Sequence, residues 1–258
     1  MNKHRFVWHD LNTTDVEGSK RFYGEIFNWK LESNDKDAYI HISAGGEMIG
    51  GVRQKGANEP GPSNWMGYVV VDDVAATVSS ITSAGGQVYM PATTIENAGT
   101  FAITADPTGA VFAPWKSARG GEDDEKQTMP KPFTFCWDEL MSTDPAAAGA
   151  FYEKVFGWKQ RAVDMGGGMI YTLLDRPGVK NVMGDQASAG GMMKSPPAVP
   201  HSFWLSYVGV DNCDSISERA TRLGATVTVP PQDIPNVGRF ACWLDPQGAS
   251  IAVLQPKM

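Results

Sequence analysis

The strongest constraint in this sequence is that motifs of its first half are repeated, in the same order, in its second half. The segment Trp8–Asp15 recurs as Trp137–Asp144, 129 residues later. The turn Asp106–Gly109 recurs as Asp245–Gly248, 139 residues later. This many ordered matches identify a tandem duplication. The change of offset predicts about ten extra residues in the second half, around Asp175–Gln186.

The duplication predicts two domains, residues 1–116 and 132–258, joined by a linker over residues 117–131. The linker contains two adjacent glycines, the acidic run Glu122–Glu125 and two prolines, and it has almost no apolar content. Such a composition is typical of an exposed connector, because it offers nothing to bury. We assign the acidic run no function beyond that.

Composition excludes several classes of protein. Hydrophobic residues make up 42% and charged residues 20%, as in folded globular chains. No apolar run approaches the ~18–20 residues that span a bilayer, and the first ten residues contain no apolar signal segment. The three cysteines form no CxxC pair, which predicts reduced thiols and a cytoplasmic location. The net charge of −7 argues against nucleic acid as a partner.

Each half divides again into two similar modules. Phe6–Leu11 has the composition of a strand, Thr14-Asp15 supplies a helix cap, and apolar residues follow at helical spacing up to Phe27. Three more short strands follow, and the pattern restarts at Trp65. The sequence therefore predicts an α+β fold of four βαβββ modules. A helix covers one face of each sheet, so paired modules enclose a cleft between their open faces.

Ordered motifs in both halves carry a resemblance to a known superfamily. They are "TTD…FYGEIFNW" with "STD…FYEKVFGW", and "DPTGAVF" with "DPQGASI". With these motifs the chain resembles the vicinal oxygen chelate superfamily, which includes glyoxalase I, bleomycin-resistance proteins and extradiol dioxygenases. It is most similar to two-domain members named as glyoxalase-like proteins or hydroxylases. The resemblance implies two tandem glyoxalase-like domains, but not one activity, because this fold carries many.

The resemblance also implies where metal ligands would stand. The metal enzymes of the superfamily place His or Glu on the first, fifth and last strands of a module pair. The corresponding residues here cannot serve as such ligands, and they are Trp8, Met66, Ala113, Trp137, Leu205 and Ala252. We therefore expect no metal cofactor. The four histidines are scattered, and a metal site outside the family pattern, using Asp10 or Glu139 with a histidine, remains an alternative.

The alternation of side chains along a strand predicts what lines each cleft instead. The first cleft would contain Trp8, Asp10, Met66, Tyr68, Ala113 and Trp115. The second would contain Trp137, Glu139, Leu205, Tyr207, Ala252 and Leu254, with Arg239 on a loop at its mouth. Aromatic walls with one carboxylate suit a flat organic molecule that carries a cation or a hydrogen-bond donor. The alternative is that the tryptophans fill a core and the carboxylates have structural partners.

Three functions follow from these clefts. The first is metal-independent binding of a small, aromatic or amphipathic molecule. The second is catalysis by a glyoxalase-like lyase or isomerase, or by a hydroxylase-like oxygenase. In it, Asp10 or Glu139 would be an acid or base of raised pKa and Tyr68 or Tyr207 would stabilise an oxyanion. The third is a structural or regulatory module with filled clefts. We expect a small-molecule ligand, no nucleic-acid or membrane partner, and a monomer or homodimer.

Overall fold

The computed structural model describes residues 4–33, 39–56, 59, 61–120, 131–165, 170–181 and 183–257. In the first half its elements are β1 (Phe6–Thr13), α1 (Val16–Phe27), β2 (Lys30–Ser33), β3 (Ile40–Ala44), β4 (Glu47–Gln54), β5 (Asn64–Val70), α2 (Val74–Ser83), β6 (Gln87–Ile95), β7 (Gly99–Ala105) and β8 (Val111–Ser117). In the second half they are β9 (Phe135–Ser142), α3 (Pro145–Phe156), β10 (Lys159–Asp164), β11 (Ile170–Lys180), β12 (Gln186–Lys194), β13 (Phe203–Gly209), α4 (Cys213–Arg222), β14 (Thr226–Ile234), β15 (Gly238–Leu244) and β16 (Ser250–Pro256). The acidic run of the linker lies outside the described residues.

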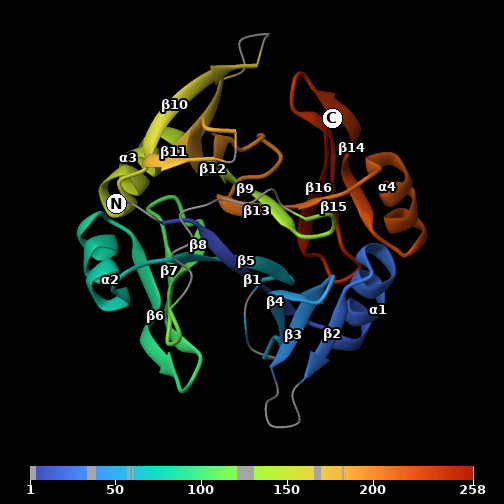
Figure 1. The fold of residues 1–258 in the computed structure, drawn as a ribbon, viewed down its shortest axis with the longest axis horizontal. Helices are drawn as coiled ribbons and strands as arrows, with labels where there is room; N and C mark the ends of the chain where they lie inside the picture. Colours follow the sequence, from blue (N-terminus) through green and yellow to red (C-terminus); the bar gives the residue numbers. More distant parts are fainter. Residues whose placement is uncertain are drawn as a thin grey trace. The chain divides into compact units, whose positions relative to one another are not determined.

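The βαβββ order is found four times, which confirms the predicted α+β class (Figure 1). The strands form two eight-stranded sheets, one in each half of the sequence. Their orders are β2-β3-β4-β1-β5-β8-β7-β6 and β10-β11-β12-β9-β13-β16-β15-β14. The first strand of each module pairs in parallel with its last strand, as β1 does with β4 and β9 with β12.

The helices begin where the sequence supplies a cap. The Asp15 carboxylate accepts a hydrogen bond from the Gly18 amide at 2.9 Å, and Asp144 accepts one from Ala147 at 3.0 Å. Asp73 and Asn212 cap α2 and α4 in the same way. Each of these contacts satisfies an amide that the first helical turn leaves without an intrahelical acceptor.

One strand is longer than the sequence pattern predicts, and another is lengthened where the change of offset predicts extra residues. The pattern indicates a strand over Val88–Met90, whereas β6 continues to Ile95 through register shifts around Pro91. Proline is tolerated there because β6 is the last strand of its sheet. The extra residues of the second half lengthen the β11–β12 hairpin, where β11 has 11 residues and its counterpart β3 has five.

Contacts divide the chain into two compact units, each built from both halves of the sequence. Unit 1 contains Met1–Val7, Gly67–Met129 and Asp138–Trp204, and unit 2 contains Trp8–Met66, Pro130–Trp137 and Leu205–Met258. In unit 1 helix α2 contacts α3, and in unit 2 helix α1 contacts α4 (Figure 1). Each unit has its own buried apolar core, to which both of its modules contribute.

A buried aromatic relay occupies the same place in each unit. In unit 2 the Trp65 indole donates to the Tyr23 hydroxyl at 2.9 Å, and Tyr23 donates to Asp245 at 2.8 Å. In unit 1 the Trp204 indole donates to the Tyr152 hydroxyl at 2.9 Å. Burial, followed by the charge of the Asp in the DPxG turn, raises the pKa of both tyrosines, which therefore stay protonated donors.

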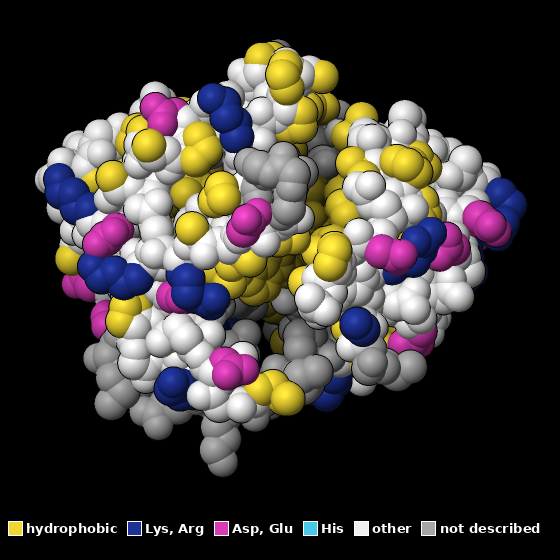
Figure 2. All heavy atoms as spheres, turned by 90° about the horizontal axis from the view of Figure 1, so that it is seen from above, with side chains coloured by type: hydrophobic (Ala, Val, Ile, Leu, Met, Phe, Trp, Pro, Cys, Tyr) yellow, Lys and Arg dark blue, Asp and Glu magenta, His cyan; other side chains and the backbone are white. Residues whose placement is uncertain are grey.

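Figure 2 shows how charged side chains are distributed on one face of the described residues. On the face drawn in Figure 2, the described Lys and Arg side chains are intermingled with Asp and Glu. Among the described helices, none is long and apolar enough to cross a membrane. The three cysteines are free thiols, and Cys213 and Cys242 are buried.

Candidate functional site

Trp8 and Asp10 lie on the same side of β1, as strand alternation predicts. The Trp8 indole N–H donates to Asp10 Oδ1 at 2.9 Å. His9 lies on the opposite side, where its ring stacks on Phe135 with centroids 3.9 Å apart. The Asp10 side chain is therefore separated from the core and directed to the helix-free face, although Asp10 is only 7% exposed.

A residue that the sequence analysis did not select completes this cluster. The Tyr39 hydroxyl donates to Asp10 Oδ1 at 2.5 Å, and the Trp8 indole N–H is shared with the Tyr39 oxygen, also at 2.9 Å. Gly51, the register partner of Asp10 on β4, makes the contact possible. A Cβ atom at Gly51 would lie 1.9 Å from the Tyr39 hydroxyl, so only glycine leaves room for the phenol.

Electrostatics fix the direction of the Tyr39 hydrogen bond. Burial, followed by the negative charge of Asp10, raises the pKa of Tyr39. The phenol is therefore protonated at neutral pH and serves as a donor to the carboxylate. Two aromatic donors meet on one carboxylate oxygen, which holds that carboxylate in a single orientation.

Further polar side chains extend this face of the sheet. The His41 ring stands edge-on to Tyr39, with centroids 5.0 Å apart, and 6.3 Å from Trp8. Next along β1, Asn12 accepts a hydrogen bond from Arg53 Nε at 2.9 Å, and Arg53 forms two further hydrogen bonds with Glu59 at 2.7 Å. We call Trp8, Asp10, Asn12, Tyr39, His41 and Arg53 the Asp10 face. All of it lies in unit 2.

The register of β9, β11 and β12 identifies the corresponding residues of the second half. Glu139 is paired with Gly191, which is paired in turn with Leu173, as Asp10, Gly51 and His41 are in the first half. A Cβ atom at Gly191 would lie 1.9 Å from the Tyr171 hydroxyl, so the glycine and the tyrosine recur. We call the corresponding set in unit 1 the Glu139 face, and it consists of Glu139, Met141, Tyr171, Leu173 and Met193.

The remaining sequence-predicted residues fall into two further groups. In unit 1, Tyr68 is the register partner of Ala113, and its ring lies 6.1 Å from those of Trp115 and Phe101. In unit 2, Tyr207 is the register partner of Ala252, and its ring lies 6.5 Å from that of Phe240. These contacts place each tyrosine on the same side of its sheet as the expected alanine.

Other candidates are buried or lie elsewhere. Met66 and Leu205 are each 5% exposed, and Trp137 is half-buried on β9. The residues expected in the first cleft are divided between the units, with Trp8, Asp10 and Met66 in unit 2 and Tyr68, Ala113 and Trp115 in unit 1. Of the second set, Glu139 lies in unit 1, and Trp137, Leu205, Tyr207 and Ala252 lie in unit 2.

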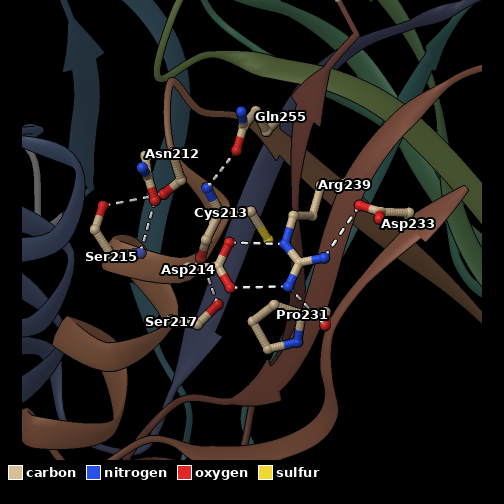
Figure 3. Close-up of polar contacts among 9 residues, drawn as sticks. All are labelled: Asn212, Cys213, Asp214, Ser215, Ser217, Pro231, Asp233, Arg239 and Gln255. Carbon is tan, nitrogen blue, oxygen red and sulfur yellow. Dashed lines mark hydrogen bonds and ion pairs between the residues drawn. The ribbon is translucent and has the colours of Figure 1, made fainter.

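Arg239 stands apart from the other candidates. Its guanidinium forms hydrogen bonds with both oxygens of Asp214, at 2.7 and 2.9 Å, and pairs with Asp233 at 3.0 Å (Figure 3). Asp214 belongs to α4, so Arg239 lies on the helix side of β15, whereas its neighbour Phe240 faces Tyr207. Strand alternation explains the difference, since adjacent residues take opposite faces.

The donor set at the family metal positions does not fit a divalent ion. These positions carry indole, thioether, isobutyl and methyl side chains, whereas such ions take imidazole, carboxylate or thiolate ligands. Within the part of the chain that the structure describes, no group of three or more His, Cys, Asp or Glu side chains could hold a metal. Glu47, an acidic residue at the start of β4, forms an ion pair with Lys131.

The fold and the duplicated motifs define a superfamily. The model of the Glyoxalase/Bleomycin resistance protein/Dioxygenase superfamily matches residues 5–113 and 136–253. The chain belongs to this superfamily, with one matched segment in each half, which confirms the resemblance that its motifs indicate.

Similar proteins cover the chain almost completely. The Mycobacterium tuberculosis protein named "Putative glyoxylase CFP32" is 37% identical over 257 residues, spanning 96% of this chain and 94% of the relative. The anthracycline biosynthesis protein DnrV of Streptomyces peucetius is 28% identical over 271 residues, spanning 96% and 92%.

Solved structures show the same architecture at low identity. A Mn(II)-bound glyoxalase from Novosphingobium aromaticivorans superposes with a TM-score of 0.63 at 16% identity, over 97% of this chain and 81% of that one. A variant of homoprotocatechuate 2,3-dioxygenase from B. fuscum gives 0.65 at 12% identity, over 98% and 71%. At these identities the likeness shows the fold alone.

Proposed function

We propose that this protein binds a small, flat organic molecule at the Asp10 face, without a metal ion. The observation that carries the proposal is the convergence of the Trp8 and Tyr39 donors on Asp10 Oδ1, at 2.9 and 2.5 Å. A carboxylate oriented in this way among aromatic rings can accept a hydrogen bond or a cation from a ligand. The rings of Trp8, Tyr39 and His41 supply flat surface for an aromatic or amphipathic body.

The relatives are consistent with this class of ligand. Two of them, DnrV and DauV, are named for anthracycline biosynthesis, and anthracyclines are flat, hydroxylated polycycles. The absence of ligand-type side chains at the family metal positions supports binding without a metal. The three free thiols support a reducing compartment such as the cytoplasm.

The test is a titration of the whole protein with an anthracycline, whose own fluorescence reports binding, after metal content has been measured by elemental analysis. We expect saturable binding by protein that contains no stoichiometric metal. Asp10→Asn should weaken binding about tenfold or more, because a charged acceptor is lost. Glu139→Gln is the matched control in the other copy and should change affinity little. Equal losses in both variants, or none in either, would refute the assignment to the Asp10 face.

A metal-free lyase or isomerase is the second candidate. The observation that favours it is the protonated Tyr39 phenol 2.5 Å from a carboxylate, an arrangement that can hold and return a proton. A relative named as a glyoxylase points the same way. Turnover of the hemithioacetal of methylglyoxal and glutathione by metal-free protein, lost in Asp10→Asn, would favour catalysis over binding. A hydroxylase-like oxygenase would instead consume oxygen, and a structural module would show neither binding nor turnover.

A further inference from the structure

Equivalent helices and turns join the two modules of each unit, but the residues in contact differ between the units. In unit 2 the start of α1 meets the DPxG turn that follows β15, and in unit 1 the end of β9, just before α3, meets the equivalent turn after β7. Each of these contacts joins one half of the sequence to the other. Residues that differ between these contacts can therefore affect whether a half pairs with the opposite half or with a second copy of itself.

The first difference lies at the helix start. In unit 2, Ser19 Oγ donates to Gln247 Oε1 at 3.3 Å. A Cβ atom at Gly18 would lie 2.7 Å from Gln247 Nε2, so glycine leaves room for the glutamine. In unit 1 the corresponding helix residues are Ala147 and Ala148, and the turn carries the shorter Thr108.

Unit 1 also shows which neighbour of Gly18 matters. The Asp15 carboxylate would be crowded by a Cβ atom at Gly18, at 2.4 Å. Yet Asp144 caps α3 in the same way and accepts a hydrogen bond from the amide of Ala147, which has a Cβ atom. The cap therefore tolerates alanine, and Gln247 is the neighbour that distinguishes the two units. The end of its side chain would have to turn away from a Cβ atom at position 18 and leave its contact with Ser19.

The second difference is one of charge. In unit 1, Lys154 Nζ donates to the Ser83 carbonyl at 2.8 Å, near the end of α2. The corresponding residues of unit 2 are Glu25 on α1 and Arg222 at the end of α4. A second half paired with its own copy would bring Lys154 to Arg222, two like charges, and would set Ala147 against Gln247. A first half paired with its copy would set Glu25 against the end of α2, where Ser83 offers no cation in place of Arg222.

We propose that Gly18, Ser19 and Gln247 in one unit, with Lys154 and Ser83 in the other, make each half of this chain select the opposite half and reject a second copy of itself. The Trp–Tyr relays are alike in both units, so they supply affinity without selectivity. Gly18, Ser19 and Gln247 supply selectivity through a contact that Ala147 and Ala148 cannot make, and Lys154 supplies it by like-charge repulsion.

The experiment begins with the full chain, in which residues 121–129 are replaced by a protease recognition sequence. The folded protein is cut, mixed with isotope-labelled cut protein, and its associated species are weighed by native mass spectrometry. We expect pairs of one first half with one second half only, whether labelled or not. Pairs of two first halves or two second halves would overturn the proposal.

A variant that should allow pairs of two second halves to form gives a test that does not depend on a loss of stability. In the cut protein, Ala147→Gly with Lys154→Glu removes the crowding with Gln247 and turns the repulsion with Arg222 into attraction. Pairs of two second halves should then be detected, and their continued absence would also overturn the proposal.

In the uncut chain, the contact can be tested with two substitutions made singly and together. Gly18→Ala should lower the thermal midpoint by about 2–4 °C, and Gln247→Thr should restore most of that loss by making the contact like that of unit 1. Gly24→Ala on the same helix is the control, because its Cβ atom would meet only the Trp29 carbonyl, at 3.5 Å. An unrestored midpoint in the double variant would contradict the role of Gln247.

Discussion

The Asp10 face and the Glu139 face share a scaffold and differ in chemistry. Both have a carboxylate paired with a glycine, over which a tyrosine hydroxyl lies. Around that centre the Asp10 face carries His41, Asn12 and Arg53, where the Glu139 face carries Leu173, Met141 and Met193. The surroundings of the carboxylate are therefore polar on the Asp10 face and apolar on the Glu139 face. The buried Trp–Tyr relays, by contrast, have the same residues in both units, so the two copies agree in these core contacts and differ on the faces of Asp10 and Glu139.

The largest expected effect tests the part that the copies share. Tyr23→Phe leaves the Trp65 indole and an Asp245 oxygen without their buried partner, and each such loss costs about 1–3 kcal/mol. We therefore expect a loss of about 2–4 kcal/mol in the free energy of unfolding by urea. Tyr152→Phe in the other relay should have a smaller effect, because it removes the acceptor of the Trp204 indole, while Asp106 Oδ2 has no hydrogen-bond partner to lose among the described residues. A loss confined to one variant would mean that the relays are not equivalent.

The next effect tests the glycine beneath each tyrosine. Gly51→Ala and Gly191→Ala each place a Cβ atom 1.9 Å from a phenol oxygen. We expect a loss of about 1–3 kcal/mol in either case, because the tyrosine must move. Only Gly51→Ala should also weaken binding of the fluorescent probe. If both variants unfold like the original protein, the packing of the tyrosines is looser than the structure indicates.

The fold was readable from the sequence, whereas the centre of the candidate site was not. Repeats, caps and alternation predicted the four modules and the shared side of Trp8 and Asp10. Tyr39 was missed because it precedes β3 and reaches Asp10 across the sheet, a contact that no local pattern encodes. A signal was present nonetheless, since Tyr39 and Gly51 recur as Tyr171 and Gly191. Arg239 follows a loop in the sequence, but it belongs to β15 and its side chain faces α4, which separates it from the predicted ligand residues.

Tyr39→Phe should have a smaller effect that separates the two faces. It removes one of the two donors to Asp10 Oδ1 and leaves that of Trp8, so affinity for the probe should fall by about threefold to tenfold, about 1 kcal/mol. Tyr171→Phe, its counterpart, should leave the affinity unchanged. The measurement is the same fluorescence titration, with far-ultraviolet circular dichroism as the control for folding. A larger loss in Tyr171→Phe would move the site to the Glu139 face.

The smallest effect concerns pH and the ion pair between Arg53 of the Asp10 face and Glu59. Hydrogen bonds from Arg53, followed by one from the Gly56 amide, lower the pKa of Glu59 to about 2. A carboxyl whose pKa is lower in the folded state binds fewer protons there than in the unfolded chain, so its contribution to stability is present above its ordinary pKa of about 4.5. That contribution declines as the pH falls from about 4.5 to about 2. Because both partners are largely exposed to solvent, the stabilisation itself is small.

Arg53→Met, which copies Met193 of the Glu139 face, should return the pKa of Glu59 toward its ordinary value. An NMR titration of the Glu59 carboxyl measures the shift directly, with Lys20→Met as the control for removing a surface charge elsewhere. An unchanged Glu59 titration in Arg53→Met would show that the hydrogen bond from the Gly56 amide, and not the arginine, sets the pKa of Glu59.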